Sequence, residues 1–183
     1  MFNVKNFAIV SLVSLASVDT FSRENTDLFP HGEDIIFPKN FKSEMSLIGS
    51  WFIPDGVAAG FHNVYMDKKS IKEYRDKKVI PNGTMIVKEL LGSNSGNYTT
   101  GQDVVYTNDN VKQYFVMIKD SENRFSSKSS SWGDGWGWGL FKPESLDLNS
   151  SSNYRTDCLG CHIPASNTDF LYKEAYPLFE HKK

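Results

Sequence analysis

Thr84-Met85-Ile86-Val87-Lys88-Glu89-Leu90-Leu91 is the clearest β-strand pattern in this sequence of 183 residues, and the turn residues Pro81-Asn82-Gly83 come just before it. Successive side chains of a strand point to opposite faces of its sheet. Lys88 therefore lies on one largely apolar face and Glu89 on the other. If both faces are covered, a charge is buried and needs a partner or a function. The pattern alone does not decide which of the two it is.

Strand patterns on both sides of this stretch extend the prediction to a sheet. Apolar and polar side chains alternate from Phe61 to Met66, as in a strand with one covered face. The further strand candidates are 61–66, 104–106, 113–119 and an aromatic strand and turn at 132–141, while 41–47 is a short helix or strand. Asp67 is placed to cap a helix over 68–78, and Thr168 to cap a short helix that ends near Tyr176. We therefore predict an α+β fold, mainly β, with an antiparallel sheet of about five strands and two or three short helices.

Near the C-terminus, Cys158-Leu159-Gly160-Cys161-His162 carries the c-type haem attachment pattern. Each thiol adds to one vinyl group of the haem, and the histidine that follows ligates the iron. Cys158 and Cys161 are the predicted attachment residues and His162 the predicted axial ligand of one covalently bound haem c.

Three other interpretations of the two cysteines are weaker. A thioredoxin-like motif belongs in an early βαβ unit. A structural zinc site normally needs four ligands, but the chain has no third cysteine and its other histidines are scattered. A disulfide would account for the cysteines and leave His162 unexplained.

Composition and length bound the remaining possibilities. The chain has 20 Lys and Arg against 22 Asp and Glu, a net charge of -2, which argues against a nucleic-acid partner.

Residues 1–16 have the pattern of a signal peptide, although a buried N-terminal helix is an alternative. We expect residues 17–39 to form a polar arm and 40–180 a single haem domain. No apolar run is long enough for a comfortable membrane span, so we expect an exported, periplasmic protein that is soluble once the signal peptide is removed.

Trp132, Trp136 and Trp138 alternate with glycines in the segment 132–139. Glycines let the backbone approach a neighbour closely, and tryptophans supply bulk. The segment is either the wall of a cofactor pocket or an aromatic strand and turn in the core, and the pattern leaves both open.

Several motifs together resemble the cytochrome P-460 family of mono-haem c-type proteins, over a region from Phe37 to Leu178. The motifs are Gly49-Ser50-Trp51, the segment Gly60-Phe61-His62-Asn63-Val64-Tyr65, Pro81-Asn82-Gly83-Thr84 with Val87-Lys88-Glu89, the tryptophan segment 132–138, Asp157 to His162, Pro164-Ala165 and Thr168-Asp169-Phe170.

The resemblance implies a mostly antiparallel β-fold, usually dimeric, with a five-coordinate haem on His162. In the enzymes of this family a lysine nitrogen bonds to the porphyrin edge, and hydroxylamine is oxidised to nitrous oxide or nitrite. The lysine position matches Lys88, which favours Lys88 as the inward charge; Glu89 then points the other way and pairs with a cation. Burial lowers the pKa of a lysine and makes it more nucleophilic.

Residues near the open side of the haem are harder to identify. Asn153 and Tyr154, just before the haem motif, and Asp134 are candidates for a distal pocket that relays protons. The alternative for Asn153 and Tyr154 is a solvated loop. We expect His62 to face the surface of the sheet.

Three functions follow from these patterns. The first is an exported enzyme that oxidises hydroxylamine at a haem cross-linked to Lys88 and passes electrons to a soluble acceptor such as a small cytochrome. The second is a nitric oxide binding protein without the cross-link, as in the sister group cytochrome c′-beta. The third, a six-coordinate electron-transfer cytochrome, is weaker because no methionine follows His162.

Overall fold

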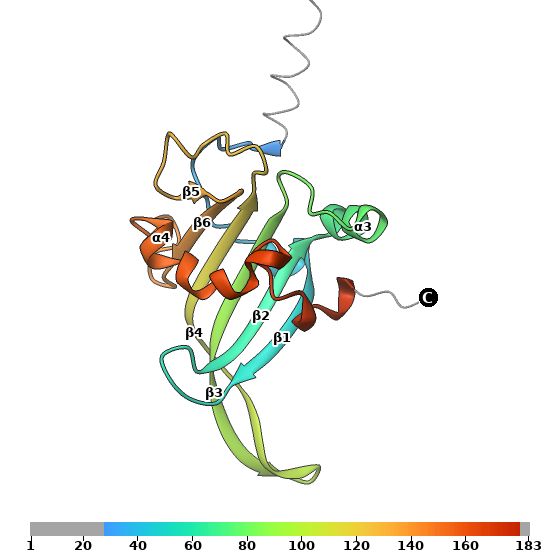
Figure 1. Ribbon diagram of the computed structural model, residues 1–183. Helices are drawn as coiled ribbons and strands as arrows, with labels where there is room; N and C mark the ends of the chain where they lie inside the picture. The colour runs from blue at the N-terminus through green and yellow to red at the C-terminus, as the bar shows by residue number, and fades with distance from the viewer. Residues whose placement is uncertain (1–27, 180–183) are drawn as a thin grey trace, which may run out of the picture.

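The computed structural model describes residues 28–179, which form one antiparallel sheet of six strands in the order β1-β2-β3-β4-β6-β5 (Figure 1). The strands are β1 Met45–Ile53, β2 Gly60–Asp67, β3 Met85–Tyr98, β4 Gly101–Lys119, β5 Trp132–Gly133 and β6 Trp136–Phe141. The predicted α+β class, mainly β, is confirmed. The expected signal peptide lies outside the described residues. Within residues 28–179, no helix is long and apolar enough to cross a membrane.

The β3–β4 pair is much longer than the sequence predicted. Segments 104–106 and 113–119, expected as two strands, belong to the single 19-residue strand β4. Beyond the sheet, β3 and β4 continue as a two-stranded ribbon, from the pair Ser93↔Thr107 to Tyr98↔Gly101 (Figure 1). Most side chains of this ribbon are exposed. Its residues are therefore held by backbone pairing, and they lack the apolar alternation that marks a half-buried strand.

The helices are short. They are α2 Phe41–Glu44, α3 Lys68–Lys77 and α4 Tyr154–Asp157, followed by the 3-10 helices η1 Leu159–Cys161, η2 Ile163–Thr168, η3 Lys173–Ala175 and η4 Pro177–Phe179. Asp67 caps α3 as predicted, because its Oδ1 accepts a bond of 2.7 Å from the backbone N–H of Ser70. The prediction that Thr168 caps a helix that ends near Tyr176 is wrong. The Thr168 hydroxyl donates to the carbonyls of Ala165 and Leu171 and stabilises a turn at the end of η2.

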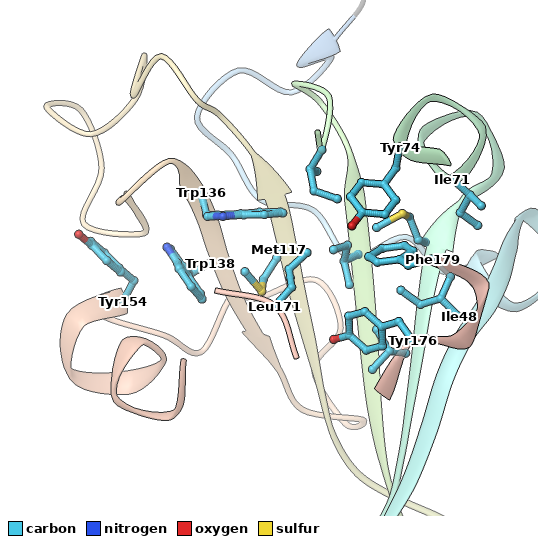
Figure 2. Packing of buried hydrophobic residues seen from close by; sticks show 14 residues of the cluster. Ile48, Ile71, Tyr74, Met117, Trp136, Trp138, Tyr154, Leu171, Tyr176 and Phe179 are labelled. Carbon is cyan, nitrogen blue, oxygen red and sulfur yellow. The ribbon is translucent and has the colours of Figure 1, made fainter. Parts of the chain in front are cut away.

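Each face of the sheet is covered by a different part of the chain. The C-terminal segment from α4 to η4 crosses one face, which we call the C-terminal face, and the chain before β1 crosses the other, the N-terminal face (Figure 1). On the C-terminal face Ile86 and Met117 belong to one hydrophobic cluster with Leu171 and Tyr176 (Figure 2). On the N-terminal face Val87 and Val116 pack with aromatic residues of the preceding chain.

Residues 28–39, the described part of the expected polar arm, pack against the sheet and are not a loose connection. Phe29, Ile35 and Phe37 are buried in the cluster on the N-terminal face. These three side chains belong to two short apolar runs, 28–29 and 35–37, each followed by a proline, and the runs are too short to show a helix or strand period. Their burial covers the face of β3 that carries Glu89.

The tryptophan segment forms a tight hairpin between β5 and β6. Asp134 and Gly135 both have positive φ, 53° and 80°, as a two-residue type I′ turn requires. A side chain at Gly137 would put its Cβ 2.8 Å from the ring of Trp132. Glycine at this position therefore lets the Trp132 ring lie directly on the backbone of β6.

Candidate haem site

A cavity of about 370 Å³ on the C-terminal face brings the four predicted haem-site residues together. Lys88 reaches it from β3, and Cys158, Cys161 and His162 reach it from the segment around η1. Much of the remaining lining is apolar and includes Leu90, Phe115, Met117 and Trp138. A second cavity of about 390 Å³ shares Lys88 and Cys161 with the first and is lined by Trp51 and Tyr172.

His162 is held in the orientation that an axial ligand needs. Its Nδ1 lies 2.8 Å from the carbonyl oxygen of Phe170. A carbonyl only accepts, so Nδ1 carries the proton and Nε2 keeps the lone pair that binds a metal. Trp138 packs against the imidazole at a centroid distance of 5.1 Å and an angle of 72°. Burial lowers the pKa of His162, helped by the charge of Lys88 and opposed by the Phe170 hydrogen bond. The ring is thereby kept neutral, as ligation requires.

The carbonyl of Phe170 is itself fixed by an unusual piece of backbone. Asp169 and Phe170 are consecutive residues with positive φ, 62° and 61°. The Asp169 carboxylate accepts a 2.7 Å bond from Lys119 Nζ and a 3.2 Å bond from Trp136 Nε1. These contacts tie the turn to strands β4 and β6, and so they set where the Phe170 carbonyl points.

Asp157 ties the loop before the haem motif to the motif itself. Its Oδ2 accepts hydrogen bonds from the backbone N–H groups of Ser152, at 2.8 Å, and Asn153, at 3.1 Å. The bond from Asn153 is the largest cause that lowers the pKa of Asp157 to about 2, with further bonds from Thr156 and Ser152. Asp157 is thus ionised at neutral pH, next to Cys158. Cys158 and Cys161 are both free thiols, and the first is half-buried while the second is exposed.

Lys88 and Glu89 lie on opposite faces of β3, as the strand period predicted. Lys88 is half-buried in the cavity, with Nζ 4.1 Å from the centroid of the Phe115 ring. Burial lowers the pKa of Lys88, and attraction to the two cysteines opposes this. Glu89 is fully buried on the N-terminal face, where it forms a 2.8 Å ion pair with Lys42 and accepts a 2.9 Å bond from the Tyr65 hydroxyl.

Of the three tryptophans predicted as pocket wall, Trp138 lines the cavity. Trp132 and Trp136 are not among the lining residues and are buried in the two hydrophobic clusters of the sheet. The sequence could not separate the three, because all of them alternate with glycine along one short segment.

The candidates for a distal pocket lie elsewhere. Tyr154 is fully buried, stacks on Trp138 at 5.9 Å and 10° (Figure 2), and donates a 2.9 Å hydrogen bond to Asp134. Asn153 caps α4 through a 3.0 Å bond from the N–H of Arg155. None of these three residues lines the cavity of Lys88. Tyr154 supports Trp138, which in turn contacts His162.

His62 is the cavity residue that sequence reasoning misplaced. It was expected to face the surface, and this is wrong: its side chain is 4% exposed and lines both cavities. The signal was present in the strand period. His62 shares a face of β2 with Val64 and Met66, which are 1% and 0% exposed, and alternation with such residues indicates the covered face.

The residues present fit a covalently attached haem. Two free thiols with the required spacing, an imidazole whose Nδ1 is already engaged, and a largely apolar wall meet in one cavity. Residues 28–179 contain no group of three or more His, Cys, Asp or Glu side chains that could hold a metal ion.

Residues 38–173 match the family model described as Cytochrome P460. This region holds all six strands and the haem motif. No curated protein matches the chain.

Proposed function

Because the chain belongs to the cytochrome P460 family and is a c-type haem protein of that family, we propose that it is an oxidoreductase that oxidises hydroxylamine. Cys158 and Cys161 attach the haem, His162 ligates its iron, and Lys88 bonds to the porphyrin edge. The bound haem supplies the iron at which a small nitrogen ligand is held and oxidised. The protein residues supply attachment, orientation and an apolar enclosure.

The observation that carries the proposal is the position of Lys88. Its side chain lines the same cavity as both cysteines and His162, although it comes from the middle of the sheet. Lysine held in apolar surroundings loses its proton more easily, and the neutral amine is the nucleophile. Burial lowers the pKa of Lys88 in this way. A lysine with no role in the cavity would be expected on the exposed part of β3.

The haem-binding residues have separate tasks. The thiols of Cys158 and Cys161 anchor the cofactor to the C-terminal segment. The Phe170 carbonyl holds the imidazole of His162 in the tautomer that leaves Nε2 free. Trp138, supported by Tyr154, packs against one side of the imidazole and holds it in place.

The test is the visible absorption spectrum of the dithionite-reduced protein, produced with haem-attachment machinery. We expect a broadened Soret band shifted far to the red in the wild type, and an ordinary high-spin ferrous c-type spectrum in Lys88→Met. Lys112→Met is the matched control, because Lys112 is a nearby lysine whose Nζ donates to the Ala59 carbonyl at 2.6 Å. Hydroxylamine oxidation is then measured with a soluble electron acceptor. An ordinary spectrum in the wild type removes the cross-link, and a protein without covalent haem refutes the proposal altogether.

A second candidate function, nitric oxide binding without oxidation, is favoured by the apolar part of the cavity wall. Phe115, Met117 and Trp138 offer no charge to a bound ligand. Tight nitric oxide binding by a protein that does not consume hydroxylamine would select this second function.

The cellular setting forms part of the proposal. Attachment of c-type haem takes place outside the cytoplasm, so we propose export through residues 1–16. Electrons from hydroxylamine pass to a soluble acceptor such as a small cytochrome, and the protein is a homodimer. Sedimentation of the haem-loaded protein measures the last point directly.

A further inference from the structure

Trp138 and Tyr154 connect His162 with the surface of the β5–β6 hairpin. The indole of Trp138 packs against the imidazole of His162 at a centroid distance of 5.1 Å, and the ring of Tyr154 stacks on that indole at 5.9 Å and an angle of 10° (Figure 2). The Tyr154 hydroxyl donates a 2.9 Å hydrogen bond to Asp134, which is exposed in the turn of the hairpin. Electrons pass most rapidly between groups in contact, so these rings form a path from the predicted axial ligand to the surface.

The hairpin fixes the Tyr154 hydroxyl beside Asp134. A Cβ at Gly133 would overlap this hydroxyl oxygen, so glycine is what lets the phenol reach the turn. The backbone N–H of Tyr154 donates to the carbonyl of Ser130 at 3.0 Å and holds the residue against the loop before β5. Tyr154 is fully buried, whereas Asp134 is exposed. The ring is therefore shielded from solvent, while its hydrogen-bond partner can exchange a proton with water.

Tyr154 and Trp138 differ in the group that could take their proton. The Nε1–H of Trp138 donates to the carbonyl of Gly133 at 3.1 Å, and a peptide carbonyl accepts a hydrogen bond but is far too weak a base to take the proton. The Tyr154 hydroxyl faces a carboxylate, which can take it. An aromatic ring that loses an electron becomes a strong acid, so the oxidation of Tyr154 is completed by proton transfer and that of Trp138 is not.

Tyr172 offers the same comparison between two tyrosines. Its ring contacts the imidazole of His162 directly, at a centroid distance of 6.2 Å. Its hydroxyl, however, donates to the backbone carbonyl of Cys161, which cannot take the proton. Contact with His162 alone would favour Tyr172 as the site of oxidation, whereas the proton acceptor favours Tyr154.

Tyr154 keeps its proton in the resting protein. Burial raises the pKa of Tyr154, the hydrogen bond and charge of Asp134 raise it further, and the charge of Arg155 lowers it. The Arg155 guanidinium lies over the Tyr154 ring, 4.8 Å from its centroid. This positive charge disfavours an oxidised ring that still holds its proton, so loss of the electron and transfer of the proton are coupled.

We propose that Tyr154 is a redox-active residue: when hydrogen peroxide is reduced at the haem, Tyr154 gives an electron through Trp138 and its proton to Asp134. Cleavage of the O–O bond takes two electrons, of which the haem gives one and Tyr154 the other. One peroxide oxygen leaves as water with both peroxide hydrogens, and the other stays at the haem. The protein is left with a neutral tyrosyl radical and a protonated Asp134. The inference rests on the haem that the proposed function places on His162, and it does not depend on Lys88.

The experiment mixes the haem-loaded ferric protein with hydrogen peroxide, without hydroxylamine, and freezes it within milliseconds for electron paramagnetic resonance. In the wild type we expect a tyrosyl radical, identified by the narrowing of its hyperfine pattern when ring-deuterated tyrosine is incorporated. Tyr154→Phe keeps the stacked ring and should lose this signal. Asp134→Asn keeps a hydrogen-bond acceptor and should lose most of it, because an amide does not take the proton. Tyr172→Phe is the matched control and should keep the wild-type signal.

Three results would overturn the inference: a wild type without a tyrosyl radical, the full signal in Tyr154→Phe, or loss of the signal in Tyr172→Phe. If Tyr154→Phe does not retain haem, Asp134→Asn decides, and the full signal there overturns the inference as well. Failure of the proposed function looks different. A protein with covalent haem that forms the Tyr154 radical but does not oxidise hydroxylamine refutes the function and leaves the inference in place, and hydroxylamine oxidation without the radical does the opposite.

Discussion

Asp169 is the residue whose replacement tests how the axial ligand is held. Its φ of 62° lies in the left-handed region, and its carboxylate joins Lys119 and Trp136. Three substitutions separate these contributions. Asp169→Asn keeps an acceptor and tolerates the left-handed conformation, Asp169→Gly keeps only the conformation, and Asp169→Ala keeps neither.

The magnitudes follow from burial. The Lys119 side chain is 8% exposed and that of Asp169 is 33% exposed. Exposed ion pairs contribute up to about 1 kcal/mol, and breaking a buried pair costs roughly 3–5 kcal/mol. For this intermediate pair we expect a loss of about 2 kcal/mol in Asp169→Gly. The left-handed conformation adds about 1 kcal/mol in Asp169→Ala, for a total of about 3 kcal/mol. Asp169→Asn should lose about 1 kcal/mol.

Urea unfolding of the haem-loaded protein measures these losses as shifts in the midpoint at constant slope. For Asp169→Ala the corresponding fall in Tm is about 6–12 °C for a chain of this length. Loss of the Phe170 anchor should also weaken the hydrogen bond to His162 Nδ1 and make the imidazole a poorer donor to iron. The reduction potential of Asp169→Ala should therefore rise.

Asp147→Asn is the control, because the ion pair of Asp147 with Lys39 is exposed on both sides, at 88% and 62%, and is expected to contribute less than about 1 kcal/mol. Equal losses in Asp169→Gly and Asp169→Ala would refute the conformational argument. Wild-type stability in Asp169→Asn would refute the contribution of the ion pair. An unchanged reduction potential in Asp169→Ala would separate Asp169 from the orientation of His162.

Two further predictions concern the other carboxylates. The pKa of Asp157 is lowered from 3.8 to about 2, so its contribution to stability is present above pH 3.8 and is lost as the pH falls toward 2. Asp157→Asn should therefore flatten the acid side of the stability curve, and acid unfolding curves that superimpose on the wild type would contradict this. Glu89→Ala should lose roughly 1–2 kcal/mol more than Glu89→Gln in urea unfolding, because Gln keeps an acceptor for the Tyr65 hydroxyl; equal losses would show that this bond contributes nothing.

The sequence predicted the parts of the site that depend on local spacing. The haem motif is a contiguous pattern, and strand period placed Lys88 and Glu89 on opposite faces. The same period indicated that His62 lies on the covered face, because it alternates with the apolar positions 64 and 66 that follow the turn at 54–56. A single histidine on a strand, however, does not reveal which group its ring is hydrogen-bonded to. That partner is the backbone carbonyl of Ala58.

Other parts could not be predicted because they depend on backbone atoms or on contacts between segments that are distant in the chain. The Phe170 carbonyl that orients His162 is an atom every residue has, so no residue type marks it. The anchor of that turn, Lys119 with Asp169, joins positions 50 apart in the chain. The polar outer half of β4 is likewise held by main-chain pairing with β3, and composition gives no signal for it.

The register between β2 and β3 determines which residues of β2 lie on each face of the sheet. It also gives the buried charge of Glu89 a structural role. In this register Asn63 lies opposite Glu89 and His62 opposite Leu90. Glu89 accepts hydrogen bonds from Asn63, at 3.3 Å, and from Tyr65, at 2.9 Å, both on β2. A slip by one residue would turn His62 to the opposite face and break both bonds. We infer that the Glu89 network on the N-terminal face fixes the register that brings His62 and Lys88 into one cavity on the C-terminal face.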